Sequence, residues 1–355
     1  MEIIMKITVR LDNYSYPIYI ENNILSRGEK YISASFKGRR IAIISDSNVF
    51  PIYGARLIEH LKEYQCFPVV LPYGEPSKSF DVLKQVYDEL LRNSFSRSDL
   101  IVALGGGVIG DLAGFVSATY LRGVPYIQIP TSLLAQVDSS VGGKVAVDLP
   151  QGKNLIGAFY HPKLVLIDPS VLTTLPVRYI NDGMAEVIKY GCIRDKELFK
   201  TITEAGSWGS LEPQIPNIIA RCVDIKREIV QEDPEDKGLR MILNFGHTLG
   251  HALEQYYGYQ RESHGEAVAI GMANITTLSE EKGLTQKGTA REIKDVLRSY
   301  NLPLTSNTEF SKLKSALRRD KKNLNNALNL ILLKEIGDSY IYPSSIDFFN
   351  ELTIV

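Results

Sequence analysis

Three of the five histidines in this chain, His247, His251 and His264, lie within eighteen residues of one another. Imidazole is the commonest neutral nitrogen ligand of zinc and the usual proton carrier near neutral pH. His247 and His251 are four residues apart, so on a helix both rings project from one face, and His264 could reach them from the next segment. This spacing predicts a metal site or an acid–base site.

Histidines at this spacing also occur as hydrogen-bonded packing residues of amphipathic helices. The third histidine and the neighbouring glycines, Gly246, Gly250 and Gly265, favour a site over that alternative. The zinc-peptidase pattern H-E-x-x-H is absent, because Thr248 stands where the general-base glutamate would have to be. The sequence therefore disfavours a zinc peptidase.

A carboxylate that could join the histidines lies in the apolar stretch 183–191. Glu186 and Lys189 are three residues apart there, a spacing typical of a surface ion pair on a helix. The small and apolar neighbours make a poor exposed surface, however, and a buried carboxylate needs a cation or a metal as partner. Glu186, His247 and His264 would provide three zinc ligands and leave open positions for substrate oxygens.

A phosphate-binding pattern occurs in the first half of the chain. Residues 105–111 read G-G-G-V-I-G-D, satisfy G-x-G-x-x-G, and lead into a helical run at 112–119. Glycines at such a turn let backbone N–H groups and the positive end of the helix approach a pyrophosphate. A plain tight turn between strand and helix is the alternative interpretation.

The usual dinucleotide fingerprint fails at the next strand, which ends without an acidic residue at Thr131 and Ser132. A ribose contact would then come from Asp46 or Glu75, for which ordinary loop or cap roles are the alternative. This departure points away from a standard Rossmann dehydrogenase.

Lysines are concentrated in two glycine-rich segments, 138–144 and 152–157, which we expect to be loops. Lys144 and Lys153 belong to them, and Arg122 lies just upstream. An ammonium group offers a point charge with three donors, which suits a phosphorylated or carboxylated small molecule. Isolated lysines usually face solvent, but this clustering favours a ligand.

Composition places the chain among ordinary globular proteins. It has 355 residues, 44% of them apolar, and a formal net charge of −1, so two domains and no nucleic-acid partner are expected. Three scattered cysteines fit neither a disulfide framework nor a C-x-x-C metal site. There is no signal peptide and no run of eighteen apolar residues, so we expect a cytoplasmic protein that does not bind membranes.

The first half alternates β-rich runs with helical stretches, which predicts a parallel-type sheet with covering helices. The expected strands are 41–46, 67–71, 99–104 and 126–130, and the expected helices are 53–64, 79–93 and 112–119.

Long helical stretches dominate after about residue 175. They are 180–191, 215–232, 241–257 and 266–282, and two strands around a turn follow at 328–333 and 339–342. Two prolines and several hydroxyl residues at 168–176 mark a boundary. We therefore expect an α/β domain over residues 1–175 and a mostly α-helical domain over residues 176–355.

Several sequence blocks together resemble the 3-dehydroquinate synthase family of the sugar-phosphate cyclase superfamily. The combination of V-D-S-S-V-G-G-K with L-N-F-G-H-T-x-G-H-A carries the resemblance, which covers essentially the whole chain. The matching blocks, in the order and spacing of that family, are 105–111, 130–144, 153–159, 184–191 and 239–272.

The resemblance implies an NAD- and metal-dependent phosphate lyase of the shikimate pathway, which leads to the aromatic amino acids. Such an enzyme converts 3-deoxy-D-arabino-heptulosonate 7-phosphate to 3-dehydroquinate and phosphate. In that family NAD oxidises a ring hydroxyl, phosphate is eliminated, the ketone is reduced again, and an intramolecular aldol reaction closes the carbocycle. The resemblance also implies an NAD-binding first domain, a metal- and substrate-binding second domain, and a homodimer.

The family's functional residues match positions in this chain. Glu186, His247 and His264 match the ligands of one zinc or cobalt ion. NAD-binding positions are Asp46, Glu75, Lys78, Gly106, Gly107, Asp111, Thr131, Ser132, Lys153, Thr173 and Thr174. Catalytic positions are Asp138, Lys144, Lys189, Arg240, Asn244 and His251, and substrate-binding positions are Arg122, Asn154, Lys226 and Lys321, with Lys322 as the alternative to Lys321.

Among these residues His251 is the expected proton-transfer group. Lys144, Arg240 and the late lysine, Lys321 or Lys322, are expected to hold carboxylate and phosphate charge. Asp236 and Asp182 stand where the family more often has other residues, which leaves an acid–base role for Asp236 open.

Three other functions are weighed against this one. Other sugar-phosphate cyclases share NAD, the metal and the early steps, but Asn244 and Arg240 favour a carboxylated substrate. A metal-dependent polyol dehydrogenase would release NADH and would not need phosphate-holding lysines. A non-catalytic nucleotide-binding relative is disfavoured by the intact histidines and lysines.

Overall fold

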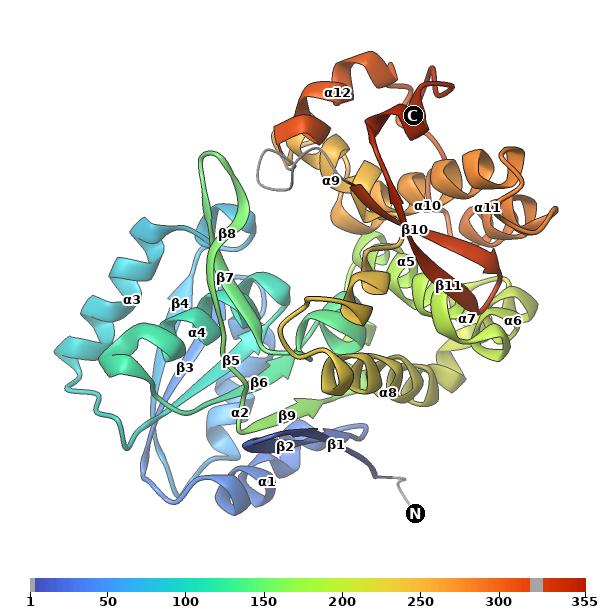
Figure 1. The fold of residues 1–355 in the computed structure, drawn as a ribbon. Coiled ribbons are helices and arrows are strands. Elements are labelled where there is room, and N and C mark those ends of the chain that lie inside the picture. The colour runs from blue at the N-terminus through green and yellow to red at the C-terminus, as the bar shows by residue number, and fades with distance from the viewer. Residues whose placement is uncertain (1–3, 320–327) are drawn as a thin grey trace. The chain divides into compact units, whose positions relative to one another are not determined.

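The computed structural model describes residues 4–319 and 328–355. The chain divides into two compact units, which are described separately (Figure 1). The first unit contains Met1–Pro176 and Lys226–Glu235, and the second contains Val177–Ile225 and Asp236–Val355.

Among the described residues, the first unit is built on a seven-stranded sheet with the strand order β1-β2-β9-β6-β5-β3-β4 (Figure 1). β1 and β2 form an antiparallel hairpin, and all other pairs in the sheet are parallel. The strands are β1 (Met5–Leu11), β2 (Tyr14–Ile20), β3 (Arg40–Asp46), β4 (Gln65–Leu71), β5 (Leu100–Gly105), β6 (Tyr126–Pro130) and β9 (Leu164–Ile167).

Both faces of this sheet are covered by helices. α3 (Phe80–Arg92) and α4 (Gly107–Thr119) pack on one apolar core, and α1 (Gly28–Ser35) and α2 (Ala55–Glu59) pack on the other. β5 and β6 are buried along their whole length, so they appear in the sequence as continuous apolar runs without alternation. The expected α/β fold with a parallel-type sheet is confirmed.

The β5–α4 turn depends on glycine for close packing. A Cβ atom added to Gly105 would lie 2.7 Å from Cβ of Ile109, and one added to Gly107 would lie 3.1 Å from Oγ of Ser139. Gly106 is the N-cap of α4 and offers no capping side chain. The first N–H groups of α4 therefore lack a side-chain cap from this position.

The two segments expected to be glycine-rich loops are in part a β-hairpin. β7 (Lys144–Leu149) pairs with β8 (Gly152–Phe159) in an antiparallel ribbon, and a Cβ atom on Gly114 of α4 would lie 2.3 Å from Cγ1 of Val145. The apolar run at 145–147 makes a strand that packs on α4. Glycine content alone therefore gave the wrong expectation for 152–157 and for the last residue of 138–144, Lys144.

Other expected elements of the first unit differ at their ends. The helix expected at 53–64 is a turn of π-helix, η2 (Phe50–Gly54), followed by the short α2. The β1–β2 hairpin, α1 and β9 were not anticipated, since short strands and helices carry a weak periodic signal. α3 begins after Ser79, whose side chain accepts from the Val82 N–H, as its sequence pattern suggests.

The second unit is mainly helical, as expected. Its long helices are α5 (Val177–Arg194), α6 (Lys196–Ala205), the first part of α8 (Ile215–Glu232), α9 (His247–Tyr256), α10 (His264–Glu281), α11 (Thr289–Ser299) and α12 (Phe310–Arg319). The expected pair of late strands is confirmed as the hairpin β10 (Leu328–Glu335) and β11 (Asp338–Ser344). Within the described part of the chain, no helix is long and apolar enough to cross a membrane.

The single helix expected at 241–257 is interrupted. A 3-10 helix, η8 (Leu239–Asn244), ends before Gly246, and α9 then begins at His247. Gly246 has a φ of 80°, in the left-handed region that glycine tolerates best. A Cβ atom added to Gly271 of α10 would lie only 1.9 Å from the Gly246 carbonyl oxygen. The backbone at Gly246 therefore packs directly against α10, which glycine at 271 permits.

Candidate active site

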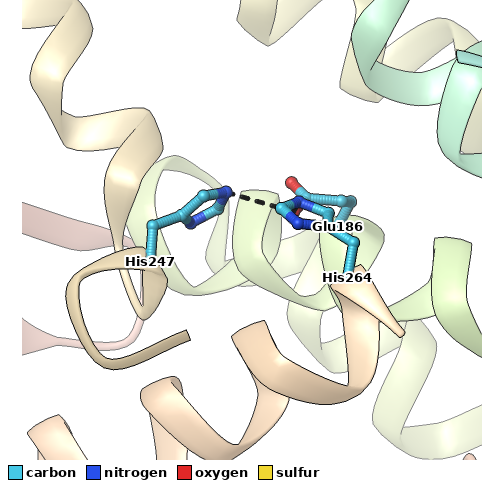
Figure 2. Close-up of side chains that lie close together, drawn as sticks. All are labelled: Glu186, His247 and His264. Atoms are coloured by element: carbon cyan, nitrogen blue, oxygen red, sulfur yellow. Dashed lines mark ion pairs between the residues drawn. The ribbon is translucent and has the colours of Figure 1, made fainter. Parts of the chain in front are cut away.

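Three potential metal ligands lie together in the second unit. Glu186 belongs to α5, His247 to α9 and His264 to α10, and their ligand atoms are all within 4.8 Å of one another (Figure 2). Nε2 of His247 and Nε2 of His264 are each 3.5 Å from Oε1 of Glu186. The structure therefore brings together the three residues that the sequence analysis grouped.

Helix starts place the two histidines. His247 is the first residue of α9 and His264 is the first residue of α10. Ser263 caps α10 in a capping box with Glu266, which fixes where that helix begins. His264 is therefore held at a defined helix end and not on a free loop.

Asp182 ties the start of α10 to α5. Its side chain accepts a hydrogen bond from the Gly265 N–H, and a Cβ atom on Gly265 would lie 2.1 Å from the Asp182 carbonyl oxygen. Glu186 is one helical turn after Asp182 on the same face of α5. Asp182, which departs from the family pattern, thus anchors the segment that brings His264 next to Glu186.

Hydrogen bonds orient both imidazole rings. Nδ1 of His247 lies 3.0 Å from the Phe245 carbonyl oxygen, and Nδ1 of His264 lies 3.4 Å from Oε2 of Glu254. A proton on Nδ1 in each ring would leave Nε2 with its lone pair directed at the shared position beside Glu186. Carbonyl and carboxylate partners of this kind are typical of metal-binding histidines.

The electrostatics of the two histidines differ. Burial lowers the pKa of His247 to about 3, so this ring is neutral near pH 7. Burial also works against protonation of His264, but hydrogen bonds and charges from Glu186 and Glu254 outweigh it and hold the pKa of His264 well above its ordinary value. In the metal-free protein a proton on His264 thus compensates the carboxylates that a divalent cation could compensate instead.

The donor set fits a divalent ion of the zinc or cobalt type. Two imidazole nitrogens and one carboxylate oxygen are the ligands of catalytic zinc sites that keep an open position. Glu186 and Lys189 are each 1% exposed and form an ion pair, so the carboxylate is held in place before any metal binds.

Three of the remaining predicted residues of the second unit, Arg240, Asn244 and His251, lie near His247 in sequence. His251 is on the exposed side of α9, with its ring centroid 5.2 Å from that of His247 and 6.1 Å from that of His264. Arg240 and Asn244 belong to η8, directly before α9, and Arg240 is buried. Lys321 and Lys322 lie outside the described residues.

In the first unit, the predicted NAD residues lie where parallel strands end. Asp46 ends β3, Gly106 and Gly107 follow β5, and Thr131 and Ser132 follow β6. Thr173 and Thr174 follow β9 on the 3-10 helix η6 (Pro169–Thr174). Since the carboxyl ends of neighbouring parallel strands share one edge of a sheet, this edge is the expected ligand site of such a fold.

Hydrogen bonds connect residues at this carboxyl edge of the sheet. The Thr131 N–H donates to the Gly105 carbonyl at 3.0 Å, and the Tyr53 hydroxyl lies 2.6 Å from Oγ1 of Thr174. Asp46 accepts from the N–H groups of Asn48 and Val49 at 2.8 and 3.0 Å, so it has the loop-capping role weighed above. That role does not exclude a ligand contact, since a carboxylate has more than two acceptor positions.

Five other predicted residues, four for NAD and one for substrate, form what we call the hairpin cluster: Glu75, Lys78, Asp111, Lys153 and Asn154. Nζ of Lys78 is 2.6 Å from Oδ2 of Asp111 and also donates to Oδ1 of Asn154. Nζ of Lys153 is 3.5 Å from Oε1 of Glu75. Lys78 is buried, which disfavours its charge, but Asp111 and Glu75 outweigh burial and raise its pKa.

Four further predicted residues of the first unit lie elsewhere: Asp138, Lys226, Lys144 and Arg122. Nζ of Lys226 is 3.0 Å from Oδ1 of Asp138 and 2.8 Å from its carbonyl oxygen. Lys144 is exposed at the start of β7. Arg122 is exposed after the C-terminal end of α4, so within this unit it is not brought to the glycine turn at the other end of that helix.

Sequence analysis did not single out two carboxylates that contact site residues. Glu254 follows His247 by seven residues and so lies on the same face of α9, a spacing that could have indicated it. Asp148 accepts from the Asn154 N–H at 2.8 Å, and no sequence pattern indicated that contact.

Comparisons with known proteins agree with these features. Residues 68–182 match the family model for the 3-dehydroquinate synthase N-terminal region, and residues 183–323 match the model for its C-terminal region. A 3-dehydroquinate synthase of Clostridium perfringens strain SM101 is 54% identical over 345 residues, which cover 96% of this chain and 99% of that protein. One from Streptococcus pneumoniae strain JJA is 42% identical over 99% of this chain and 100% of that protein.

Solved structures of related enzymes share the whole fold. A 2-deoxy-scyllo-inosose synthase complexed with carbaglucose-6-phosphate, NAD+ and Co2+ superposes with a TM-score of 0.88 at 25% identity, over 98% of this chain and 99% of that chain. A 2-epi-5-epi-valiolone synthase from Streptomyces hygroscopicus subsp. jinggangensis with NAD+ and Zn2+ bound has a TM-score of 0.88 at 27% identity, over 96% of each chain. A glycerol dehydrogenase from Schizosaccharomyces pombe, at 17% identity and a TM-score of 0.58, shares the fold alone.

Proposed function

The chain belongs to the 3-dehydroquinate synthase family, and we propose that it catalyses the reaction of that family. The reaction converts 3-deoxy-D-arabino-heptulosonate 7-phosphate to 3-dehydroquinate and inorganic phosphate, and the enzyme is a carbon–oxygen lyase. The observation that carries the proposal is the match to this family along almost the entire chain, with Glu186, His247 and His264 intact and close together.

Glu186, His247 and His264 would hold one zinc or cobalt ion. The proposal is supported by the Nε2 atoms directed at Glu186 and by the two structural relatives that carry Co2+ or Zn2+. When bound, the ion polarises the substrate hydroxyl that is oxidised and the carbonyl that forms. Glu254 and the Phe245 carbonyl hold the two rings in the orientation that ligation needs.

NAD would bind at the carboxyl edge of the first unit's sheet. The proposed contacts are Asp46, Gly106, Gly107, Thr131, Ser132, Thr173 and Thr174 on that edge, together with Glu75, Lys78, Asp111 and Lys153 of the hairpin cluster. The glycine N-cap of α4 supports this, because Gly106 has no capping side chain and the first N–H groups of the helix can donate to a pyrophosphate oxygen. Bound there, NAD would supply a reversible hydride acceptor, so none would be consumed over a turnover.

Charged side chains would hold the sugar acid. Lys144, Asn154, Lys226 and Arg122 from the first unit, with Lys189, Arg240 and Asn244 from the second, are the proposed contacts, and Asp138 would orient Lys226. Lys321 stays a proposed contact that lies outside the described residues. Lysine and arginine donors suit a substrate with one carboxylate and one phosphate.

His251 would move the proton that accompanies phosphate loss. Its ring is on the exposed side of α9, next to the two histidine ligands, where a substrate can reach it. Deprotonation beside a ketone makes phosphate a leaving group by β-elimination, and histidine is the side chain that most often serves as general base in such a step.

A homodimer and a cytoplasmic location are also proposed. Leu155 and Phe159 support the homodimer, because these apolar side chains of β8 are 55% and 50% exposed. We expect the enzyme to act in the cytoplasm, where NAD and phosphorylated sugars are available. Light scattering of the purified chain tests the dimer, and a mass of one chain would contradict it.

The decisive experiment separates this lyase from a dehydrogenase of the same fold. Purified protein is incubated with 3-deoxy-D-arabino-heptulosonate 7-phosphate and less than one equivalent of NAD. We expect one phosphate and one 3-dehydroquinate per substrate, with no lasting absorbance of NADH. Stoichiometric NADH without phosphate would instead indicate a polyol dehydrogenase. Phosphate release from an uncarboxylated sugar phosphate, and not from this substrate, would indicate another sugar-phosphate cyclase.

A further inference from the structure

Two irregularities occur close together in the β7–β8 hairpin. The pairing register shifts between Val147 and Leu149, so Asp148 lies at a β-bulge. Asn154, on the opposite strand, has a φ of 57°, in the left-handed region that side chains other than glycine rarely adopt. Bulges and such residues persist only where the surrounding contacts hold them, and they are frequent beside active sites.

Hydrogen bonds connect both irregular residues to Lys78 in a closed ring. The Asp148 N–H donates to the Lys78 carbonyl at 2.8 Å. Oδ1 of Asp148 accepts from the Asn154 N–H at 2.8 Å, and Oδ1 of Asn154 accepts from Nζ of Lys78. The ladder pairs on either side, Val147 with Ile156 and Leu149 with Gly152, leave residues 153–155 of β8 opposite Asp148.

This ring fixes both the backbone and the side chain of Asn154. The carboxylate of Asp148 satisfies the backbone N–H in the left-handed conformation, and the Lys78 ammonium determines that Oδ1 of the amide faces the cluster. The two N–H donors of Nδ2 are then held on the other side of the amide group. Lys78 is itself fixed, because it is buried and paired with Asp111 on α4.

We propose that Asp148 is a positioning residue for substrate binding, which it serves by holding Asn154 in its left-handed conformation with the Nδ2 donors presented to the sugar phosphate. The inference rests on the proposed function, since Asn154 is a proposed substrate contact. Asp148 touches neither substrate nor NAD in this account, and it acts through the Asn154 backbone.

Asp148→Ala removes the acceptor of the Asn154 N–H but leaves the backbone contact of residue 148 with Lys78. We expect KM for the sugar phosphate to rise about tenfold, the effect of losing one charge-assisted hydrogen bond, with kcat and the Kd of NAD changed less than about twofold. Asp148→Asn should restore KM to within about threefold of the parent, because the amide oxygen can accept the same bond. Asp12→Ala, which removes a carboxylate from the exposed turn between β1 and β2, is the matched control and should leave KM, kcat and the Kd of NAD unchanged.

A double mutant separates positioning from a general loss of stability. In an Asn154→Gly background, which keeps the left-handed backbone but lacks the amide, Asp148→Ala should raise KM less than about twofold further. Equal increases in both backgrounds, an unchanged KM in Asp148→Ala, or an Asp148→Asn variant as impaired as Asp148→Ala would each overturn the proposal. Failure of the proposed function would be seen separately, because the parent enzyme would then release no phosphate. The contact between Asp148 and Asn154 could still be tested in that case, since its loss in Asp148→Ala should speed hydrogen exchange at the Asn154 N–H.

Discussion

Oε2 of Glu254 lies 3.4 Å from Nδ1 of His264, on the opposite side of the imidazole from the nitrogen that faces Glu186. Glu254 is 3% exposed, so this carboxylate is buried with the ring it orients. A carboxylate in this position fixes the tautomer and raises the basicity of a metal-binding histidine. The distance therefore links a residue outside the proposed ligand set to metal affinity.

Glu254→Ala should weaken zinc binding by roughly ten- to hundredfold, the usual cost of losing such a partner. Competition titration with a chromogenic chelator measures the affinity. Glu254→Gln keeps an acceptor oxygen and should lose less zinc affinity than Glu254→Ala. Glu281→Ala, which removes an exposed carboxylate at the end of α10, is the control. Unchanged zinc affinity in Glu254→Ala would show that the contact does not support ligation.

His264→Ala should abolish metal binding and turnover while NAD affinity stays within about twofold of the parent. The reason is that the second unit provides the proposed ligands and the first unit provides the proposed NAD residues, so the two perturbations should be independent. Metal analysis and calorimetric NAD titration of the same preparation check both parts. Full zinc content in this variant would contradict the ligand set.

Lys78→Met should destabilise the first unit by about 3 kcal/mol, because it leaves the Asp111 carboxylate without the ammonium that lies 2.6 Å away in a largely buried setting. Urea unfolding followed by circular dichroism measures the change. Adding Asp111→Asn should recover more than half of the loss, since the unpaired charge is then removed. A double variant as unstable as Lys78→Met would mean that packing of the lysine stem, and not the charge, is responsible.

The hairpin cluster also predicts a pH dependence. Burial raises the pKa of Asp148 to about 6 from an ordinary 3.8, although the Asn154 N–H and the Lys78 charge oppose it. An acid with a raised folded-state pKa holds its proton more tightly in the folded protein, so its contribution to stability falls as pH rises from about 4 to about 6. Asp148→Asn removes this loss.

We therefore expect Asp148→Asn to be more stable than the parent above about pH 6, with no difference below about pH 4. The gain should be about 1 kcal/mol, because the side chain is only partly buried and solvent screening reduces the full effect. Thermal unfolding midpoints across this pH range test it. A variant with the same midpoint as the parent at about pH 7.5 would show that the carboxylate is not strained when ionised.

The sequence predicted that Glu186, His247 and His264 lie together, because these residues stand out chemically. Glu186 is a carboxylate in an apolar stretch, and His247 and His264 flank glycines that permit close helix packing. The interruption at Gly246 was not foreseen, since His247 and His251 keep their helical spacing whether or not the helix extends upstream. That these residues bind a metal stays a prediction, although their proximity supports it.

Contacts that depend on irregular backbone could not be read from the sequence. Asp148 meets Asn154 where the pairing register of the hairpin shifts, and nothing in the local sequence pattern specifies that shift. The hairpin itself was hidden by its glycines, which suggested loops. Strand ends were easier to predict, since apolar runs followed by Thr131, or by Gly106 and Gly107, mark where a parallel sheet presents its carboxyl edge.

Cobalt titration of the metal-free enzyme tests the central claim most directly, because the visible absorption of the ion and the release of phosphate can be followed in one sample. Both signals should rise together and saturate at one cobalt per chain in the parent, and neither should rise in His264→Ala. Phosphate release without metal, or the same cobalt spectrum in His264→Ala as in the parent, would contradict the account.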